Sequence, residues 1–262
     1  MRFEKKVRGI KMVYDDLGQG DVILLIHGQP FNRNMWKYQV EEFSKNHRLI
    51  IPDLRGYGES GITEGIVLLD EIALDLLCLL EDLNISKATV IGLSMGGQIA
   101  LELYKLRPDL FQSIILADTE ARAEDEKGYE SRINLSKRIL EDGMKKFTQE
   151  RIKHFMCDNT FKSKPEIVNH LTQMMITTSP AGSAAVQRGR AERLDYTPLL
   201  KRIDFPALII VGALDEFTPI ESAEYMHQRI TNSKLVIIEN CGHVSNMEQP
   251  EEFNRALKEF LN

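Results

Sequence analysis

The sequence has few cysteines and no long apolar run. Its three cysteines, Cys78, Cys157 and Cys241, are widely spaced, and no histidine accompanies them at metal-ligand spacing. A disulfide scaffold and a structural zinc site are therefore not expected. The longest apolar runs, such as 22–26, are far shorter than the roughly 20 residues of a membrane-spanning helix, and the first ten residues lack the apolar segment of a signal peptide. These absences predict a cytoplasmic protein that does not enter a membrane.

Basic residues are also fewer than acidic ones. The chain has 33 Lys and Arg against 39 Asp and Glu, which gives a formal net charge of −6. No global positive field is available to attract nucleic acid or an anionic membrane surface, so neither is expected as a partner. With 262 residues, 43% of them hydrophobic, the chain can bury a large core as one α/β domain or as one domain that carries an insertion.

Short apolar runs alternate with helical patterns along much of the chain. The runs are almost continuously apolar, which is typical of strands covered on both faces. Between them, residues 66–83 repeat Leu and Ile at steps of three and four, and acidic residues including Asp75 are expected on the solvent side. The alternation predicts an α/β fold with a mostly parallel central sheet flanked by helices. The expected strands are 22–26, 48–52, 88–92, 113–117, 206–212 and 234–239.

The strand-like runs stop from Thr119 to about Tyr196, where charge rises and helical stretches follow one another. We therefore expect one core domain, residues 1–118 and 197–262, interrupted by a helical cap of residues 119–196. Most Met and Phe residues of the cap are expected in its own core.

Three arginines, Arg188, Arg190 and Arg193, lie close together in the predicted cap. Arginine matches the geometry of a carboxylate, so a substrate carboxylate is one interpretation of this group. Because such residues are more often solvated on a helix face, the prediction is that they are exposed.

The segment Gly92-Leu93-Ser94-Met95-Gly96-Gly97 lies between a predicted strand and a predicted helix. A GxSxG sequence in this context is typical of a nucleophile held on a tight strand-to-helix turn, where small residues on either side let the strand and the helix approach. Ser94 is therefore the candidate nucleophile, although serine is also a common helix N-cap.

A serine hydroxyl needs a base, and the base needs a carboxylate. Among the six histidines, His243 follows the last predicted strand, at the sheet edge where functional residues of open α/β sheets collect. Asp215 and Asp118 both end strands in suitable positions. We prefer Asp215, because it follows the strand next to the His243 loop, whereas Asp118 could cap the first helix of the insertion. The chain order Ser94, Asp215, His243 is the one expected for a nucleophile elbow of this kind.

With these motifs the chain resembles the α/β-hydrolase fold family, in its branch of serine esterases, lactonases and perhydrolases. The resemblance also covers the loop His27-Gly28-Gln29-Pro30 and the segment 53–60. It implies that the main-chain amides of Gln29 and Met95 form an oxyanion hole. It further implies that residues 119–196 form the roof of the substrate pocket.

The function implied by the resemblance is hydrolysis of a small carboxylic ester or lactone through an acyl-enzyme, with no metal or organic cofactor. Serine at position 94, where dehalogenases and epoxide hydrolases of this fold carry aspartate, argues against both activities. A perhydrolase and a C–C bond hydrolase of the same fold remain alternatives, as does a small-molecule receptor or signalling protein on a hydrolase scaffold. The sequence leaves a homodimer open.

Overall fold

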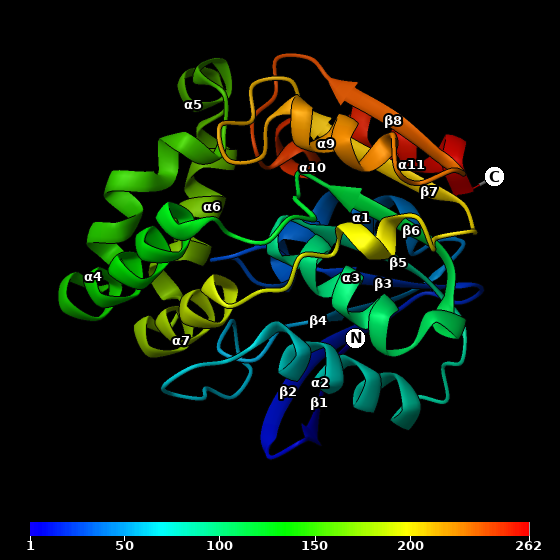
Figure 1. Cartoon of the computed structure of the whole chain (residues 1–262), viewed down its shortest axis with the longest axis horizontal. Helices are drawn as coiled ribbons and strands as arrows, with labels where there is room; N and C mark the ends of the chain where they lie inside the picture. Colours follow the sequence, from blue (N-terminus) through cyan, green and yellow to red (C-terminus); the bar gives the residue numbers. More distant parts are fainter. Residues whose placement is uncertain (262) are drawn as a thin grey trace.

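A computed structural model describes residues 1–261, which form an eight-stranded sheet with helices on both faces (Figure 1). The strand order is β1-β2-β4-β3-β5-β6-β7-β8. The pairs β1/β2 and β2/β4 are antiparallel and all other pairs are parallel. The predicted mostly parallel sheet is confirmed, and its six predicted strands are found within two residues of their expected ends. The strands are β1 (Arg2–Val7), β2 (Ile10–Leu17), β3 (Val22–Ile26), β4 (Arg48–Pro52), β5 (Ala88–Leu93), β6 (Phe111–Ala117), β7 (Ala207–Gly212) and β8 (Ser233–Ile238).

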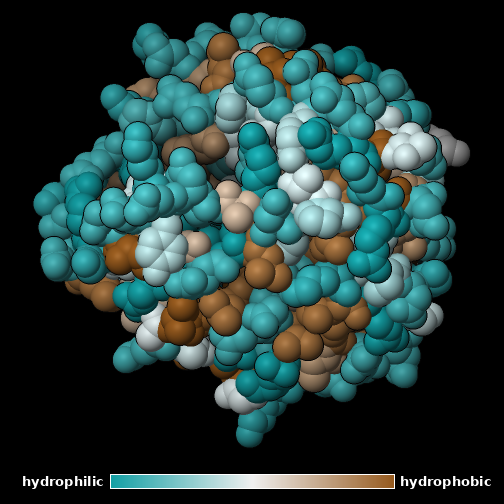
Figure 2. Space-filling view, in the orientation of Figure 1, coloured by the Kyte–Doolittle hydropathy of each residue, from teal (hydrophilic) through white to brown (hydrophobic). Residues whose placement is uncertain are grey.

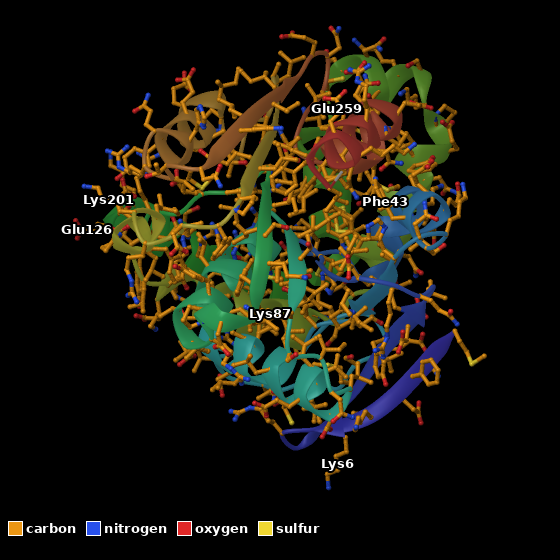
Figure 3. All side chains as sticks on the ribbon, turned by 90° about the vertical axis from the view of Figure 1, so that its right-hand side faces the viewer. Lys6, Phe43, Lys87, Glu126, Lys201 and Glu259 are labelled. Carbon is orange, nitrogen blue, oxygen red and sulfur yellow. The ribbon has the colours of Figure 1, made fainter. Side chains whose placement is uncertain are left out.

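The hairpin β1–β2 at one edge of the sheet was not predicted. Most side chains of β1 are exposed, so its sequence lacks the continuous apolarity that identified the inner strands. Arg8 and Gly9 join the two strands with φ values of 42° and 88°, as a two-residue hairpin turn with two left-handed residues requires. The hairpin lies at one end of the molecule, where Lys6 projects away from the body (Figure 3).

Each inner strand sends alternate side chains to two separate cores. Leu24 and Ile26 contribute to the core shared with α2, α3 and α9, whereas Ile23 and Leu25 contribute to the core shared with α1 and α11. Because successive side chains of a strand point to opposite faces, a strand covered on both sides must be apolar throughout. The helices of the core are α1 (Lys37–Phe43), α2 (Leu69–Asp82), α3 (Met95–Leu106), α8 (Thr197–Leu200), α9 (Ile220–His227), α10 (Ser245–Glu248) and α11 (Pro250–Leu261).

Asp75 lies in the core and not on the solvent face of α2, so that prediction was wrong. Its side chain is fully buried and accepts two hydrogen bonds of 2.7 Å from the guanidinium of Arg55. Arg8 pairs with the same carboxylate at 3.2 Å. Burial raises the pKa of Asp75 despite these two cations. Helical periodicity cannot reveal a buried ion pair whose partner lies elsewhere in the chain.

Four helices inserted between β6 and β7 form the predicted cap (Figure 1). Helix α7 packs against the segment that leads into α2. The two backbones are so close that only glycine fits at two positions of α7. A Cβ atom on Gly189 would lie 1.7 Å from the carbonyl oxygen of Val67, and one on Gly182 would lie 2.3 Å from that of Gly56. The inserted helices are α4 (Glu126–Arg151), α5 (Asp158–Ser163), α6 (Pro165–Thr177) and α7 (Pro180–Ala191).

The surface in Figure 2 carries hydrophobic residues that are interspersed with hydrophilic ones. Among the helices of residues 1–261, none combines the length and the apolar character that crossing a membrane would require.

Candidate active site

Ser94 occupies the tight turn between β5 and α3. Its backbone has φ 55° and ψ −117°, a combination that costs conformational energy for any residue with a side chain. The glycines around it allow the turn to close. A Cβ atom on Gly92 would lie 2.3 Å from the carbonyl oxygen of Gly96, and one on Gly96 would lie 2.1 Å from that of Ile26. Ser94 lines the cavity that lies under the cap.

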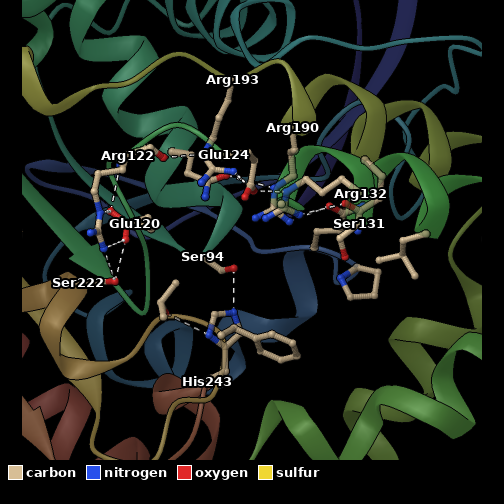
Figure 4. Close-up of a pocket in the computed structure, with 18 of the residues that line it drawn as sticks. Ser94, Glu120, Arg122, Glu124, Ser131, Arg132, Arg190, Arg193, Ser222 and His243 are labelled. Atoms are coloured by element: carbon tan, nitrogen blue, oxygen red, sulfur yellow. Dashed lines mark hydrogen bonds and ion pairs between the residues drawn. The ribbon is translucent and has the colours of Figure 1, made fainter. Parts of the chain in front are cut away.

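Ser94, His243 and Asp215 are linked by two hydrogen bonds. His243 Nε2 lies 2.8 Å from Ser94 Oγ (Figure 4). His243 Nδ1 lies 2.7 Å from Asp215 Oδ2. Asp215 is fixed in turn, because it accepts hydrogen bonds from the main-chain N–H groups of Phe217 and Thr218 at 2.8 and 3.0 Å. The structure therefore brings together the three side chains that the sequence selected.

The electrostatics of this group suit a base at position 243. Burial opposes the charged form of His243, but the charge and hydrogen bond of Asp215 outweigh it, so the pKa of His243 is raised. For Asp215, burial is likewise outweighed, by the charge and hydrogen bond of His243, and its pKa is lowered. An ionised Asp215 accepts a hydrogen bond from the Nδ1–H group of His243, which leaves Nε2 unprotonated and free to accept the proton of Ser94.

Asp118, the alternative acid, is bonded elsewhere. Its carboxyl group accepts hydrogen bonds from the N–H of Gly212 at 2.9 Å and from the hydroxyl of Ser245. Burial, together with the charge of Asp215, raises the pKa of Asp118 to about 8. Asp118 thus joins β6 to the loops that carry Asp215 and His243, and it is not hydrogen-bonded to the imidazole within residues 1–261.

The loop after β3 packs directly on the serine turn. A Cβ atom on Gly28 would lie 3.2 Å from Cβ of Ser94. Gln29 follows Gly28, and Met95 is the first residue of α3. The main-chain N–H groups of Gln29 and Met95 donate to no acceptor in the described part of the chain. Two free donors next to Ser94 are what an oxyanion site at this serine would need.

The side chains of His27 and Asp53 fix the conformation of this loop through hydrogen bonds. His27 Nδ1 donates to the carbonyl of Gly28 at 2.9 Å, and Nε2 accepts from the N–H of Leu54 at 3.0 Å. Burial lowers the pKa of His27, which favours the neutral ring that this pair of bonds requires. Asp53 accepts from the N–H groups of Arg33 and Glu59, both at 2.8 Å.

A cavity of about 630 Å³ lies over Ser94 and His243 and is roofed by the cap. Phe147, Phe155 and Phe217 give it an apolar side. The cap also contacts the His243 loop directly, since the N–H of His243 donates to the carbonyl of Phe155 at 3.1 Å. Across residues 1–261, no cluster of three or more His, Cys, Asp or Glu side chains is arranged to hold a metal ion.

The opposite side of the cavity is lined by charged residues. Of the three arginines that were predicted to be exposed, two are buried here, so the prediction was wrong for these two. Arg190 and Arg193 are buried, whereas Arg188 is partly exposed and donates to the carbonyl of Gly65. Arg193 and Arg132 both pair with Glu124 (Figure 4). The prediction failed because α7 is rich in Ala, Gly and Ser, and these small residues let it pack on almost all sides.

Several polar residues of the cavity were not identified from the sequence, among them Gln98, Glu124 and Arg132. Gln98 lies one turn after Ser94 on α3, so its spacing in the sequence could have identified it. Glu124 and Arg132 carried no comparable signal, because charged residues are common throughout this part of the chain.

Comparisons with known proteins agree with this architecture. Residues 21–250 match the family model described as alpha/beta hydrolase fold. The chain is similar to the 3-oxoadipate enol-lactonase 2 of Acinetobacter baylyi, with 31% identity over 96% of this chain and 93% of that protein. It also superimposes on a malate-bound thermophilic esterase from Thermogutta terrifontis with a TM-score of 0.95 and 36% identity, covering 100% and 98% of the two chains. A bromoperoxidase from Bacillus anthracis has a TM-score of 0.88 and 27% identity, covering 100% and 99%.

Proposed function

Because this chain belongs to the alpha/beta hydrolase fold family, among relatives that include esterases and enol-lactonases, we propose that it hydrolyses small carboxylic esters or lactones with Ser94 as nucleophile. The observation that carries the proposal is the unbroken hydrogen-bond chain from Ser94 through His243 to Asp215 at the floor of a cavity. His243 acts as general base, and Asp215 orients it and stabilises its charged form.

In the proposed mechanism, Ser94 Oγ attacks the carbonyl carbon while His243 Nε2 takes its proton. The N–H groups of Gln29 and Met95 bind the negative oxygen of the tetrahedral intermediate. The intermediate collapses, and His243 returns the proton to the departing alcohol oxygen. For a lactone, this alcohol stays on the acyl chain. Water, deprotonated by His243, then attacks the acyl-enzyme and releases the acid and free Ser94.

We assign residues 1–118 and 197–262 to the catalytic core and residues 119–196 to a cap that selects the substrate. The contribution of Phe147, Phe155 and Arg190 to the cavity supports this role of the cap. A location in the cytoplasm is supported by the cysteines, all three of which are free thiols, as is usual in reducing compartments.

Assembly as a homodimer is a separate proposal. The loop before α2 exposes two large apolar side chains, Ile62 and Ile66, which a second copy could cover. Light scattering coupled to size-exclusion chromatography tests it, and a monomer mass at micromolar concentration would contradict it.

Initial rates on p-nitrophenyl esters from acetate to decanoate, with one simple lactone added, test the enzymatic proposal. The wild-type protein should turn over part of this panel with a chain-length optimum. Ser94→Ala should reduce turnover to the background rate at an unchanged melting temperature. Turnover that persists in a folded Ser94→Ala variant would refute the proposal.

A further inference from the structure

The guanidinium group of Arg190 lies buried in the wall of the cavity and has no anionic partner among residues 1–261. Its Nε donates to Gln98 Oε1 at 3.1 Å and its Nη1 donates to Gln29 Oε1 at 3.0 Å. Both acceptors are neutral amides. No carboxylate among residues 1–261 lies within 4.0 Å of the Arg190 nitrogens, and Nη2 donates no hydrogen bond within the same residues. Figure 4 shows the group above Ser94, on the cavity side of α7.

The neighbouring carboxylate does not neutralise Arg190. The carboxylate of Glu124 is engaged by two other arginines, Arg132 and Arg193. Burial, and then the charges of Arg132 and Arg193, lower the pKa of Arg190, although guanidinium groups stay protonated in proteins. A buried charge without a partner is destabilising. The cavity therefore holds a cation whose counter-ion must come from outside the chain.

We propose that Arg190 binds a carboxylate group of the substrate, so that the preferred esters or lactones are anionic and carry this group in addition to the scissile carbonyl. The inference rests on the proposed function of Ser94. Arginine presents parallel N–H groups that match the two oxygens of a carboxylate, and the Nη2 group of Arg190 has no acceptor within residues 1–261.

Gln29 links this anion site to the reacting carbonyl. Its side-chain Nε2 donates to the carbonyl of Ser183 on α7 at 3.1 Å, while its Oε1 accepts from Arg190. The main-chain N–H of the same residue is one of the two proposed oxyanion donors. A substrate carboxylate bound by Arg190 therefore has a fixed position relative to the oxyanion site. Its binding then orients the scissile bond for attack.

The test compares monomethyl half-esters of succinate, glutarate and adipate with the corresponding methyl ester half-amides. Each amide has nearly the same shape as its acid but carries no charge. Methanol release should show, for at least one chain length, a kcat/KM for the acid that exceeds that for the amide by about tenfold or more, as expected for a charge-assisted pair. The acid preference should disappear in Arg190→Gln and persist in Arg188→Gln, a neighbour on α7 that does not line the cavity.

Equal rates for acids and amides in the wild type, or an acid preference that survives Arg190→Gln, would overturn the inference. Turnover of the half-amide by Arg190→Gln reports that this variant is folded. Arg190→Lys, which keeps the charge but loses the paired geometry, should retain only part of the preference.

A binding measurement separates this inference from the proposed function. Calorimetric titration of glutarate into Ser94→Ala should detect binding that is lost in the double variant Ser94→Ala/Arg190→Gln. If no ester is hydrolysed but this binding is found, the hydrolase proposal fails and the carboxylate site stands. If esters are hydrolysed but no dicarboxylate from succinate to adipate binds, the carboxylate site fails and the hydrolase proposal stands.

Discussion

Arg190 of the cap donates a 3.0 Å hydrogen bond to the side chain of Gln29, a core residue that lies next to the serine turn. The contact joins the side chain that we propose to bind the substrate carboxylate to the loop that we propose to stabilise the reaction intermediate. Sequence reasoning assigned Gln29 only a main-chain role. The structure adds a side-chain role, because the same residue also bonds Ser183 of α7 and so ties the cap to the core.

Gln98→Glu should stabilise the protein and abolish its preference for anionic esters. The new carboxylate would meet Arg190 Nε, which lies 3.1 Å from Gln98 Oε1, and would supply the missing counter-ion. Because the guanidinium is already buried, only the carboxylate adds a new desolvation cost. We expect a gain of about 1 kcal/mol or more, or roughly 2–4 °C in melting temperature. Differential scanning calorimetry measures it, and the gain should vanish in Gln98→Glu/Arg190→Gln. An unchanged or lower melting temperature would count against an unpaired Arg190.

Asp215→Asn should lower kcat by about 10⁴-fold, because an amide cannot stabilise the imidazolium and favours the wrong tautomer of His243. Asp118→Asn should change kcat by less than about tenfold, since its contacts are to Gly212 and Ser245. Steady-state kinetics of both variants on one p-nitrophenyl ester decide between the two acids. The opposite ranking would assign the acid to Asp118.

The value of kcat/KM should rise with pH through a midpoint above 6.5, because only the neutral form of His243 can accept a proton and its pKa is raised. Burial and Arg190 favour the neutral form, whereas Asp215 and Asp118 favour the charged form. Arg190→Gln should therefore move the midpoint to higher pH.

A neutral ester is the substrate for this profile, so that no substrate group titrates in the same range. Wild-type activity that stays constant down to pH 5, or a midpoint that falls in Arg190→Gln, would contradict the assignment of the base.

Much of the core could be predicted from sequence because its strands are covered on both faces. Runs of apolar residues located the strands β3 to β8, and the glycines at 92 and 96 located the serine turn, where close backbone contact excludes a side chain. The edge hairpin was missed, since β1 faces solvent and carries charge. The burial of Asp75 was missed because Arg55, its partner, is distant in sequence.

The proximity of Ser94 and His243 could be predicted, because a local motif marks each of these residues. The residues of the cavity wall could not be predicted, because the polarity of the wall depends on which face of α7 meets the core. Arg188 and Arg190 are two residues apart, yet one reaches solvent and the other a buried cavity. That difference arises from packing of small residues in α7 against α4 and the loop before α2, which no pattern within α7 encodes.

The central claim is that Ser94 is an activated nucleophile. Incubation with a fluorophosphonate, followed by intact mass and peptide mapping, tests it most directly. We predict a single adduct on the peptide that contains Ser94, and none in Ser94→Ala of the same melting temperature. An adduct on another residue, or an unmodified Ser94 in a wild-type protein that hydrolyses esters, would contradict the account.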